Sequence, residues 1–213
     1  INNRKVLNGF FESLELIDKV TDILRTIDKI DKIGKEAVKE ELIKFEISEE
    51  KADKILNFIA ITGSNSEILE KLEELKIENE TFKNGLFELK EVVKNLKAFN
   101  VPEDNFNINL TIARGLDYYT GTVYETNLVK YPELGSICSG GRYENLTEYY
   151  TKQKLPGIGI SIGLTRLFSQ LKDIGLLDEV DENKSVTKVL VMDIGSQDFA
   201  YMLKIATAFR ESG

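Results

Sequence analysis

Apolar residues recur at helical spacing along the N-terminal half of the chain. Val6, Leu7, Phe10, Phe11 and Leu14 form one such stripe, which predicts an amphipathic helix packed on a core. A second stripe predicts a helix over 18–33 that ends at Gly34, a residue type that commonly terminates helices. Further helices are predicted over 35–46, 49–61, 66–76 and 80–99, with N-caps at Ser48 and Asn79 and a break at Gly63-Ser64.

After Pro102 the spacing changes from helical to alternating. Phe106, Ile108, Leu110 and Ile112 predict a strand, and so do 122–126 and 136–139, whereas 144–150 indicates a short helix. The clearest alternation follows, with Pro156, Ile158, Ile160 and Ile162 on one strand face and Gly157, Gly159, Ser161 and Gly163 on the other. The isoleucine side is expected to be core. The nearly bare side leaves two readings open, close packing of another element or room for a flat ligand.

The remainder predicts a helix, a linker and one further strand and helix. Apolar spacing over 164–172 predicts a helix with Arg166 in its first turn, from which the guanidinium can turn back toward the bare strand face. The polar stretch 173–185 indicates a linker, KVLVMDIG a buried strand and 198–211 an amphipathic helix. One such strand–helix unit cannot bury both its faces, so it is expected to begin another α/β domain.

Composition limits the class of protein. With 213 residues, 42% of them hydrophobic, the chain can build one large or two modest domains, and a net charge of −8 argues against binding nucleic acid through diffuse positive charge. The absence of His and a single Cys exclude a disulfide framework, the common zinc ligand sets and His-dependent triads, so no protein-bound metal is expected. Cys138 fits a small packing residue better than a nucleophile. No apolar run approaches the roughly 20 residues that cross a bilayer, and we expect a soluble cytoplasmic protein without a membrane partner.

Charge and unusual residues are distributed unevenly. Residues 35–97 carry 11 Lys and 15 Asp or Glu without Arg, which a solvated helical surface explains, with a partner-binding face as the alternative. Residues 114–166 hold 8 of the 15 Gly, 7 of the 8 Tyr and the only Cys. Gly admits close approach of a ligand, Tyr offers an apolar body with a polar tip, and Arg offers a planar fork for carboxylate or phosphate. This stretch therefore predicts a pocket for a small anionic ligand.

Three segments of this stretch, in order, carry a family resemblance. ARGLDYYTGTVYE and SICSGGRYENL resemble the histidine-binding signatures of histidyl-tRNA synthetases, and PGIGISIGLTRL resembles motif 3 of these class II aminoacyl-tRNA synthetases. The resemblance implies an α+β fold, part of an antiparallel-sheet catalytic core with a helical insertion and the first strand and helix of an α/β anticodon-binding domain. The implied parts are core helices (1–34), a helical insertion (35–101), a core segment with the signatures (102–178), a linker (179–187) and the truncated anticodon-binding domain (188–213).

The resemblance also implies roles for individual residues. Arg114 matches the catalytic arginine that contacts the α-phosphate and the substrate carboxylate, with a structural ion pair to Asp117 as the alternative. The histidine-binding residues would be Arg114, Leu116, Tyr118, Tyr119, Gly121, Gly141 and Tyr143, with Tyr119 reaching the imidazole and core packing as the alternative for Tyr118. ATP would contact Arg114, Gly159, Gly163 and Arg166, whereas Arg142 is expected to be a structural pairing residue. Thr165 stands where motif 3 commonly has Glu, so an orienting carboxylate is missing beside Arg166.

The implied reaction activates histidine with ATP, accompanied by Mg2+, and transfers it to histidine tRNA in a homodimeric enzyme. Motifs 1 and 2 of the family would precede Ile1, so we expect this chain to be a fragment with about half of the active site and to be inactive alone. The alternative is a synthetase-like regulatory subunit that binds histidine or a partner enzyme without charging tRNA. The intact RGLDYY and motif 3 patterns favour the ligase.

Overall fold

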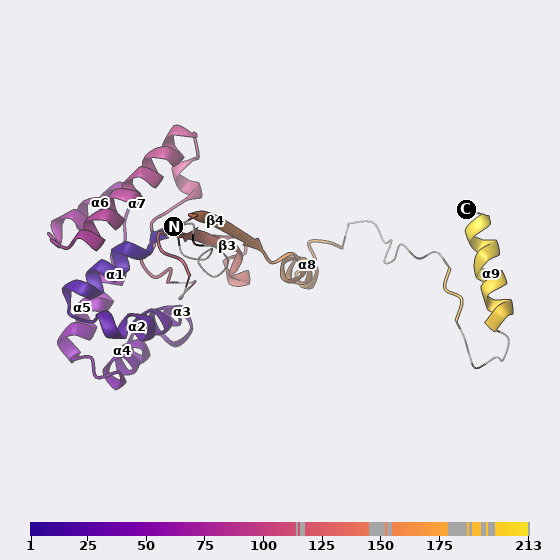
Figure 1. Ribbon diagram of the computed structural model, residues 1–213, viewed down its shortest axis with the longest axis horizontal. Coiled ribbons are helices and arrows are strands. Elements are labelled where there is room, and N and C mark those ends of the chain that lie inside the picture. The colour runs from indigo at the N-terminus through magenta and orange to yellow at the C-terminus, as the bar shows by residue number, and fades with distance from the viewer. Residues whose placement is uncertain are drawn as a thin grey trace. The chain divides into compact units, whose positions relative to one another are not determined.

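The computed structural model describes residues 1–113, 115, 118–144, 152, 155–178, 187, 189–192, 195 and 199–212. It divides into two compact units, Ile1–Leu167 and Phe168–Gly213. The helices and strands, shown in Figure 1, are β1 (Asn2–Asn3), α1 (Arg4–Ser13), η1 (Ile17–Lys19), α2 (Val20–Ile27), α3 (Ile30–Ile33), α4 (Lys35–Lys44), α5 (Glu49–Ile59), α6 (Asn65–Glu74), α7 (Glu80–Ala98), η2 (Glu103–Asn105), β2 (Thr122–Asn127), η3 (Pro132–Leu134), β3 (Ser136–Tyr143), β4 (Gly157–Ile162), α8 (Leu164–Asp173) and α9 (Phe199–Glu211).

The helices of the first unit form where apolar spacing and capping residues predict them. Ser48 and Asn79 accept hydrogen bonds from the backbone N of Lys51 and Phe82, as N-caps do. Ser64 begins α6 with a reciprocal capping box to Glu67. The predicted helix over 18–33 is interrupted and becomes η1, α2 and α3, while Gly34 ends it with φ +83°, as expected.

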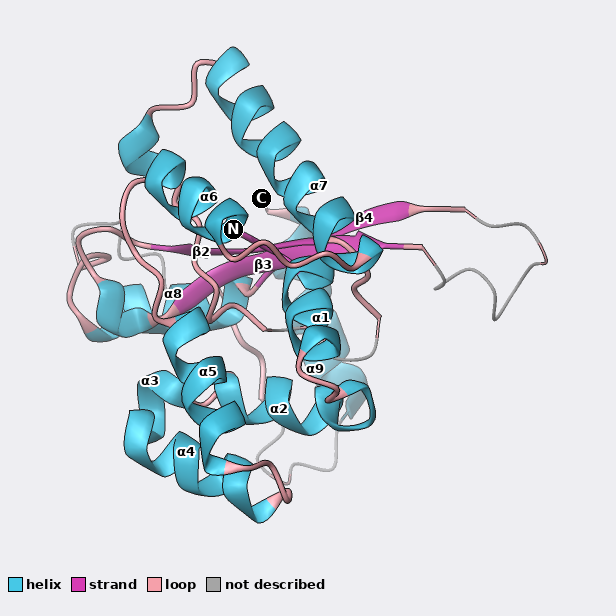
Figure 2. Cartoon of the chain, turned by 90° about the vertical axis from the view of Figure 1, so that its left-hand side faces the viewer, coloured by secondary structure: helices cyan, strands magenta, loops and turns pink. Residues whose placement is uncertain are grey.

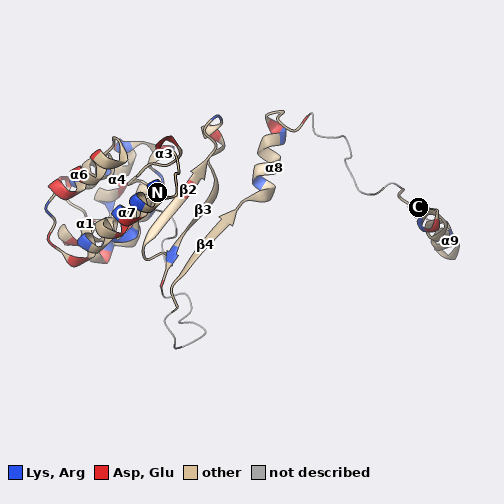
Figure 3. Ribbon diagram, turned by 90° about the horizontal axis from the view of Figure 1, so that it is seen from above, with Lys and Arg blue, Asp and Glu red and all other residues tan. Residues whose placement is uncertain are grey.

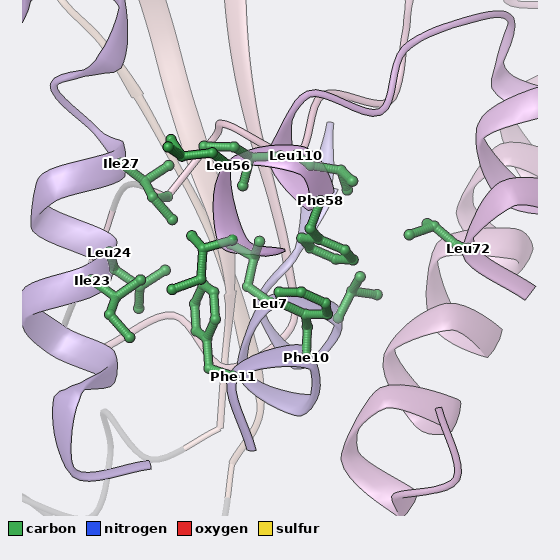
Figure 4. Close-up of a cluster of buried hydrophobic side chains, with 14 of the residues drawn as sticks. Leu7, Phe10, Phe11, Ile23, Leu24, Ile27, Leu56, Phe58, Leu72 and Leu110 are labelled. Atoms are coloured by element: carbon green, nitrogen blue, oxygen red, sulfur yellow. The ribbon is translucent and has the colours of Figure 1, made fainter. Parts of the chain in front are cut away.

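One buried core joins these helices. Leu7, Phe10 and Phe11 of α1 lie among apolar side chains from α2, α5 and α6 (Figure 4). The rings of Phe10 and Phe58 stack with their centroids 3.8 Å apart. Charged residues recur along these helices (Figure 3), and some are paired, for instance Lys39 with Glu49 and Asp53. Residues from both 1–34 and 35–101 therefore share a single core, and whether they are separate modules remains a prediction.

Helices α1 and α7 cross closely because glycine lies at the contact. A Cβ on Gly85 would lie 2.5 Å from the backbone N of Val6 and 2.7 Å from the carbonyl carbon of Lys5. On the other side of the crossing, a Cβ on Gly9 would lie 2.7 Å from Cβ of Phe82. Asn79 adds a hydrogen bond of 2.6 Å from its side-chain N to the carbonyl of Gly9. The crossing therefore tolerates only glycine at these two positions.

We expect Gly85→Ala to lower the free energy of unfolding by roughly 1–3 kcal/mol through overpacking. The sign is diagnostic because Ala in a helix interior is otherwise favoured over Gly by about 1 kcal/mol. Denaturant unfolding measures the change, and Asn95→Ala, at an exposed site on the same helix, serves as the control. A Gly85→Ala chain at least as stable as the control would contradict the close crossing.

The strands form one antiparallel sheet in the order β1-β2-β3-β4 (Figure 2). β2 pairs with β3 in a register that sets Val123 opposite Gly141, and β3 pairs with β4 from Cys138 opposite Ile162 to Tyr143 opposite Gly157. The predicted strands over 122–126, 136–139 and 157–162 are confirmed, and β3 extends further, to Tyr143. This combination of helices and an antiparallel sheet confirms the α+β fold class.

The strand predicted over 106–112 is wrong. Ile108 and Leu110 are buried as the alternation requires, but the segment is irregular because other groups take its backbone hydrogen bonds. Asn65 bonds the carbonyl of Phe106 (3.1 Å) and the N–H of Ile108 (2.8 Å). Asn2 donates to the carbonyls of Leu110 and Ile112 at 3.3 and 3.0 Å. The side chains of Asn65 and Asn2, together with the backbone of Ile1, which bonds Asn107 and Asn109, thus replace a neighbouring strand.

The expectation that the isoleucine side of β4 is core is also wrong for this chain. Ile158, Ile160 and Ile162 are 71%, 65% and 62% exposed. The alternation is real, but these side chains stay largely exposed, and α7 and this sheet face line an open hollow that includes Phe87, Tyr124 and Ile158. The alternation of apolar residues therefore predicted which face of β4 is apolar, but it did not predict which element would cover that face.

In the second unit α9 confirms the predicted helix, but the predicted strand is not present in its described part. Residues 189–192 are irregular, and 188, 193 and 194 lie outside the described residues. So do 179–186, most of the predicted linker, and 145–150, most of the short helix predicted over 144–150.

Candidate functional site

The sheet presents two faces that differ in the size of their side chains. Because side chains alternate along a strand, the observed register places Gly141, Tyr143, Gly157, Gly159 and Ser161 on one side. We call this side the glycine face. Tyr124, Gly140, Arg142 and the isoleucines of β4 lie on the opposite side. The glycine face brings together, from separate segments, residues that the sequence assigned to both the histidine pocket and ATP.

Tyr119 lies against the glycine face between two glycines. A Cβ on Gly141 would lie 2.9 Å from Cδ1 of Tyr119, and a Cβ on Gly115 would lie 2.9 Å from its Cγ. Gly115 also has φ +72°, a conformation that side-chain-bearing residues rarely adopt. The backbone N of Tyr119 donates to the carbonyl of Gly115 at 3.3 Å. The two glycines therefore fix the ring's position on both sides.

Tyr143 covers part of the bare strand face of β4. A Cβ on Gly157 would lie 2.5 Å from Cε2 of Tyr143, and one on Gly159 would lie 3.5 Å from its Cε1. Of the two readings left open by the alternation, close packing therefore holds at Gly157. Ser161 and Gly163 further along are exposed, so open surface remains at that end.

Tyr124 connects β2, β3 and β4 on the sheet face opposite the glycine face. Its hydroxyl donates to the carbonyl of Gly159 at 3.0 Å, and its ring passes Gly140, where a Cβ would lie 2.7 Å from Cζ. Burial raises the pKa of the Tyr124 phenol. The side chain therefore spans β3 and fixes the β4 backbone behind Gly159.

Burial raises the pKa of Tyr119 to about 12, and a hydrogen bond with the Tyr118 side chain adds to the shift. The Tyr118 and Tyr119 ring centroids are 4.3 Å apart. Tyr118 itself is 48% exposed, so it does not pack in the core, which was the alternative for this residue. At neutral pH the Tyr119 phenol keeps its proton and can donate or accept a hydrogen bond.

The raised pKa predicts how stability changes in alkaline solution. Tyr119 would ionise near pH 10 in the unfolded chain but only near pH 12 in the folded one, so its contribution is complete below pH 10 and is lost as pH rises through 12. The ultraviolet absorbance of phenolate should show a group titrating near pH 12 that Tyr119→Phe removes. Tyr201→Phe, a change at an exposed tyrosine, is the control. A difference titration centred near pH 10 would contradict the burial of this phenol.

Arg166 and Gly163 lie where β4 joins α8. Arg166 is in the first turn of α8, as predicted, and its Nη2 donates to the carbonyl of Leu134 at 3.3 Å. The backbone N of Gly163 donates to the carbonyl of Ile137 at 3.1 Å. The guanidinium thus lies by the β2–β3 connection, beside Gly135. Its assignment to ATP stays a prediction.

The other predicted residues divide into those the structure places and those outside its description. Gly121 is buried at the start of β2, and Arg142 pairs with Glu144 at 3.5 Å, the structural role expected of it. Arg114 and Leu116, together with Asp117, lie outside the described residues. The catalytic assignment of Arg114 therefore stays a prediction.

Sequence reasoning missed three buried polar residues at the N-terminus, Asn2, Asn3 and Arg4. They are almost completely buried, at 0%, 0% and 2% exposure. The guanidinium of Arg4 donates to the carbonyls of Ala113 and Gly115 at 2.8 and 3.3 Å. The spacing of Arg4 to Leu7 and Phe11, three and seven residues, places it on the buried stripe of α1 and was the available signal.

Within the described ranges, no three His, Cys, Asp or Glu side chains come together as ligands for a metal ion. Likewise, no helix in the described part of the chain has the length and apolar character needed to span a bilayer.

The mixed helical and antiparallel-sheet core is that of a class II aminoacyl-tRNA synthetase. The family model described as histidyl-tRNA synthetase matches residues 5–167, and the chain belongs to that family. The histidine–tRNA ligase of Clostridium tetani (strain Massachusetts / E88) is 54% identical over 212 residues, covering all of this chain and 48% of the relative. The crystal structure of histidyl-tRNA synthetase from Nostoc sp. PCC 7120 superposes with a TM-score of 0.82 at 44% identity, covering all of this chain and 50% of that one.

A more distant structure shares the fold alone. It is a Bacillus halodurans C protein described as an ATP phosphoribosyltransferase regulatory subunit/histidyl-tRNA synthetase, with a TM-score of 0.62 and 18% identity. The match covers 96% of this chain and 56% of that one. Since 48% of the Clostridium tetani relative is covered, the chain spans about half the length of the curated relatives it matches.

Proposed function

We propose that the full-length parent, the complete polypeptide that contains these residues, is a histidine–tRNA ligase. A histidine carboxylate oxygen attacks the α-phosphorus of ATP, the bond from that phosphorus to the bridging oxygen breaks, and pyrophosphate leaves. A hydroxyl of the terminal tRNA ribose then attacks the histidyl carbonyl and displaces AMP. The observation that carries the proposal is Tyr119 held on the glycine face in a chain of this family.

The glycine face suits the histidine end of this reaction. Tyr119 supplies a protonated phenol for the imidazole, and a site built on such a hydrogen bond discriminates against side chains that lack the polar partner. Tyr143 and Gly141 form the adjoining wall of the histidine pocket. Leu116, Tyr118 and Gly121, which are close to Tyr119 in the sequence, complete the proposed set. The rings give the pocket an apolar body and the phenols give it directional groups.

We assign the recognition of the ATP phosphates to two arginines, Arg114 and Arg166. Arg114 would stabilise the charge that accumulates on the α-phosphate oxygens, which is the main catalytic requirement of a step without a protein nucleophile. Arg166, in the first turn of α8, would hold outer phosphates of ATP, with Gly159 and Gly163 giving the nucleotide access to the backbone. Mg2+ would enter with ATP as part of the substrate. Histidine tRNA, a second copy of the chain and a cytoplasmic setting complete the proposal.

The competing function is that of a regulatory subunit that binds histidine or a partner enzyme without charging tRNA. The Bacillus halodurans protein shares the fold and is described as a regulatory subunit/histidyl-tRNA synthetase, which is why we consider this alternative. Retention of both RGLDYY and the motif 3 arginine in this chain favours the ligase. A regulatory subunit needs a ligand pocket but has no use for donors to the α-phosphate.

Exchange of labelled pyrophosphate into ATP by the full-length parent tests the proposal. We expect exchange that depends on added histidine and is absent with other amino acids. Histidine binding without exchange would support the regulatory alternative. Exchange supported equally by several amino acids would contradict the specificity assigned to Tyr119.

A further inference from the structure

Arg4 contacts both ends of the loop that carries Tyr119. Its Nη1 and Nη2 donate to the carbonyls of Ala113 and Gly115 at 2.8 and 3.3 Å, and its backbone N donates to the carbonyl of Gly121 at 2.8 Å. We use the word loop for the described residues Gly115, Tyr118, Tyr119, Thr120 and Gly121, which belong to no helix or strand. A single residue of α1 thus closes this loop from both sides.

The position of Arg4 is unfavourable for α1 alone. A cation in the first turn of a helix opposes the helix dipole, and a guanidinium that is 2% exposed has lost its hydration. The planar fork offsets these costs by donating from two separate nitrogens to two carbonyls, a fixed spacing that the single nitrogen of lysine does not match. The contacts with Ala113 and Gly115 therefore explain why an arginine occupies this position.

The loop transmits the position of Gly115 directly to the Tyr119 ring. Gly115 accepts the hydrogen bond from the backbone N of Tyr119 and lies in van der Waals contact with the ring. The next residue, Thr120, donates from its backbone N to the carbonyl of Arg142 at 2.9 Å. A shift of Gly115 away from α1 would therefore move the phenol relative to Gly141 and the rest of the glycine face.

We propose that Arg4 is a positioning residue that fixes the loop from Gly115 to Gly121, and through it the Tyr119 phenol, for recognition of the histidine imidazole. This inference rests on the proposed function for the identity of the ligand. In the described part of the chain Arg4 donates to backbone carbonyls, so it would act on recognition through the loop. In the sequence, Arg114 lies between Ala113 and Gly115, whose carbonyls accept from the Arg4 guanidinium.

The test uses Arg4→Lys and Arg4→Met in the full-length parent, with two readouts. Hydrogen–deuterium exchange of the peptide spanning 115–121 reports loop order without any need for activity. Pyrophosphate exchange reports the KM for histidine and the KM for ATP separately. Asn2→Ala is the matched control, because it removes a buried side chain that holds the carbonyls of Leu110 and Ile112, before the loop.

We expect faster amide exchange at 115–121 in both Arg4 variants, and a histidine KM raised roughly tenfold with the KM for ATP little changed. Asn2→Ala should leave loop protection and the histidine KM near wild type even if it lowers stability. Unchanged protection of the loop overturns the inference whatever the activity, and so does lost protection with an unchanged histidine KM. If the wild-type protein shows no histidine-dependent pyrophosphate exchange, the proposed function fails and the ligand assigned to the loop fails with it, whereas the amide exchange still decides whether Arg4 holds the loop.

Discussion

Gly115→Ala in the full-length parent is expected to lower histidine-dependent pyrophosphate exchange by about a hundredfold or more, because a displacement of about 1 Å at a substrate-positioning group can cost that much. The added Cβ would lie 2.9 Å from Cγ of Tyr119 and closer still to one edge of the ring. The ring cannot retreat in its own plane, since Gly141 backs its other edge. The phenol must therefore leave its position, or the loop must open.

The effect of backbone strain in Gly115→Ala can be measured separately from the effect of the clash between the added Cβ and the Tyr119 ring. Gly34 has φ +83°, similar to the +72° of Gly115, and has open space around the position of a Cβ. Gly34→Ala should therefore suffer a conformational penalty of roughly 1–3 kcal/mol, because φ +83° with ψ +167° is a region essentially restricted to glycine, yet should show near-normal exchange. Equal loss of exchange in both variants would show that the glycines act through stability alone, and thermal unfolding of both proteins checks this.

Arg114→Ala is expected to reduce exchange by on the order of a hundredfold or more, comparable to removal of one oxyanion donor. The loss should be mainly in kcat, since the charge that Arg114 meets develops in the transition state. Arg25→Ala is the control, because Arg25 is exposed and its side chain pairs only loosely, at 3.9 Å, with Asp22 of its own helix. Near-wild-type exchange by Arg114→Ala would contradict the assignment and favour a structural ion pair for this arginine.

Local signals predicted the helices well. Ser48, Asn79 and Gly34 mark their termini correctly because caps and left-handed glycines act over one turn and need no distant partner. The stripe of α1 likewise identified Leu7, Phe10 and Phe11 as core. These features depend on spacing, which the sequence contains directly.

Features that depend on distant partners were predicted less well. The alternation at Ile108 and Leu110 indicated burial correctly, but Asn2 and Asn65 satisfy the backbone there, and nothing in the local sequence names them. The isoleucines of β4 likewise indicate a face that another layer could cover, without naming that layer. The periodicity of apolar residues predicts which face of an element is apolar, but it does not predict which other element packs against that face.

The candidate site shows the same division. Gly and Tyr enrichment located the pocket region, and the register of β3 and β4 then brought Gly141, Tyr143 and Gly159 onto one face. The sequence could not show that Tyr143 packs over Gly157, nor that Arg4 reaches Gly115 across more than a hundred residues. The spacing of Arg4 on the α1 stripe was a signal of burial, but the spacing does not identify the carbonyls that accept from its guanidinium.

A crystal structure of the full-length parent with a non-hydrolysable analogue of histidyl-adenylate tests the central claim most directly. We predict that the imidazole lies within hydrogen-bond distance of the Tyr119 hydroxyl, beside Gly141 and Tyr143, with the nucleotide extending past Gly159 toward Arg166. An analogue bound away from the glycine face, or bound there without contact to Tyr119, would contradict the account.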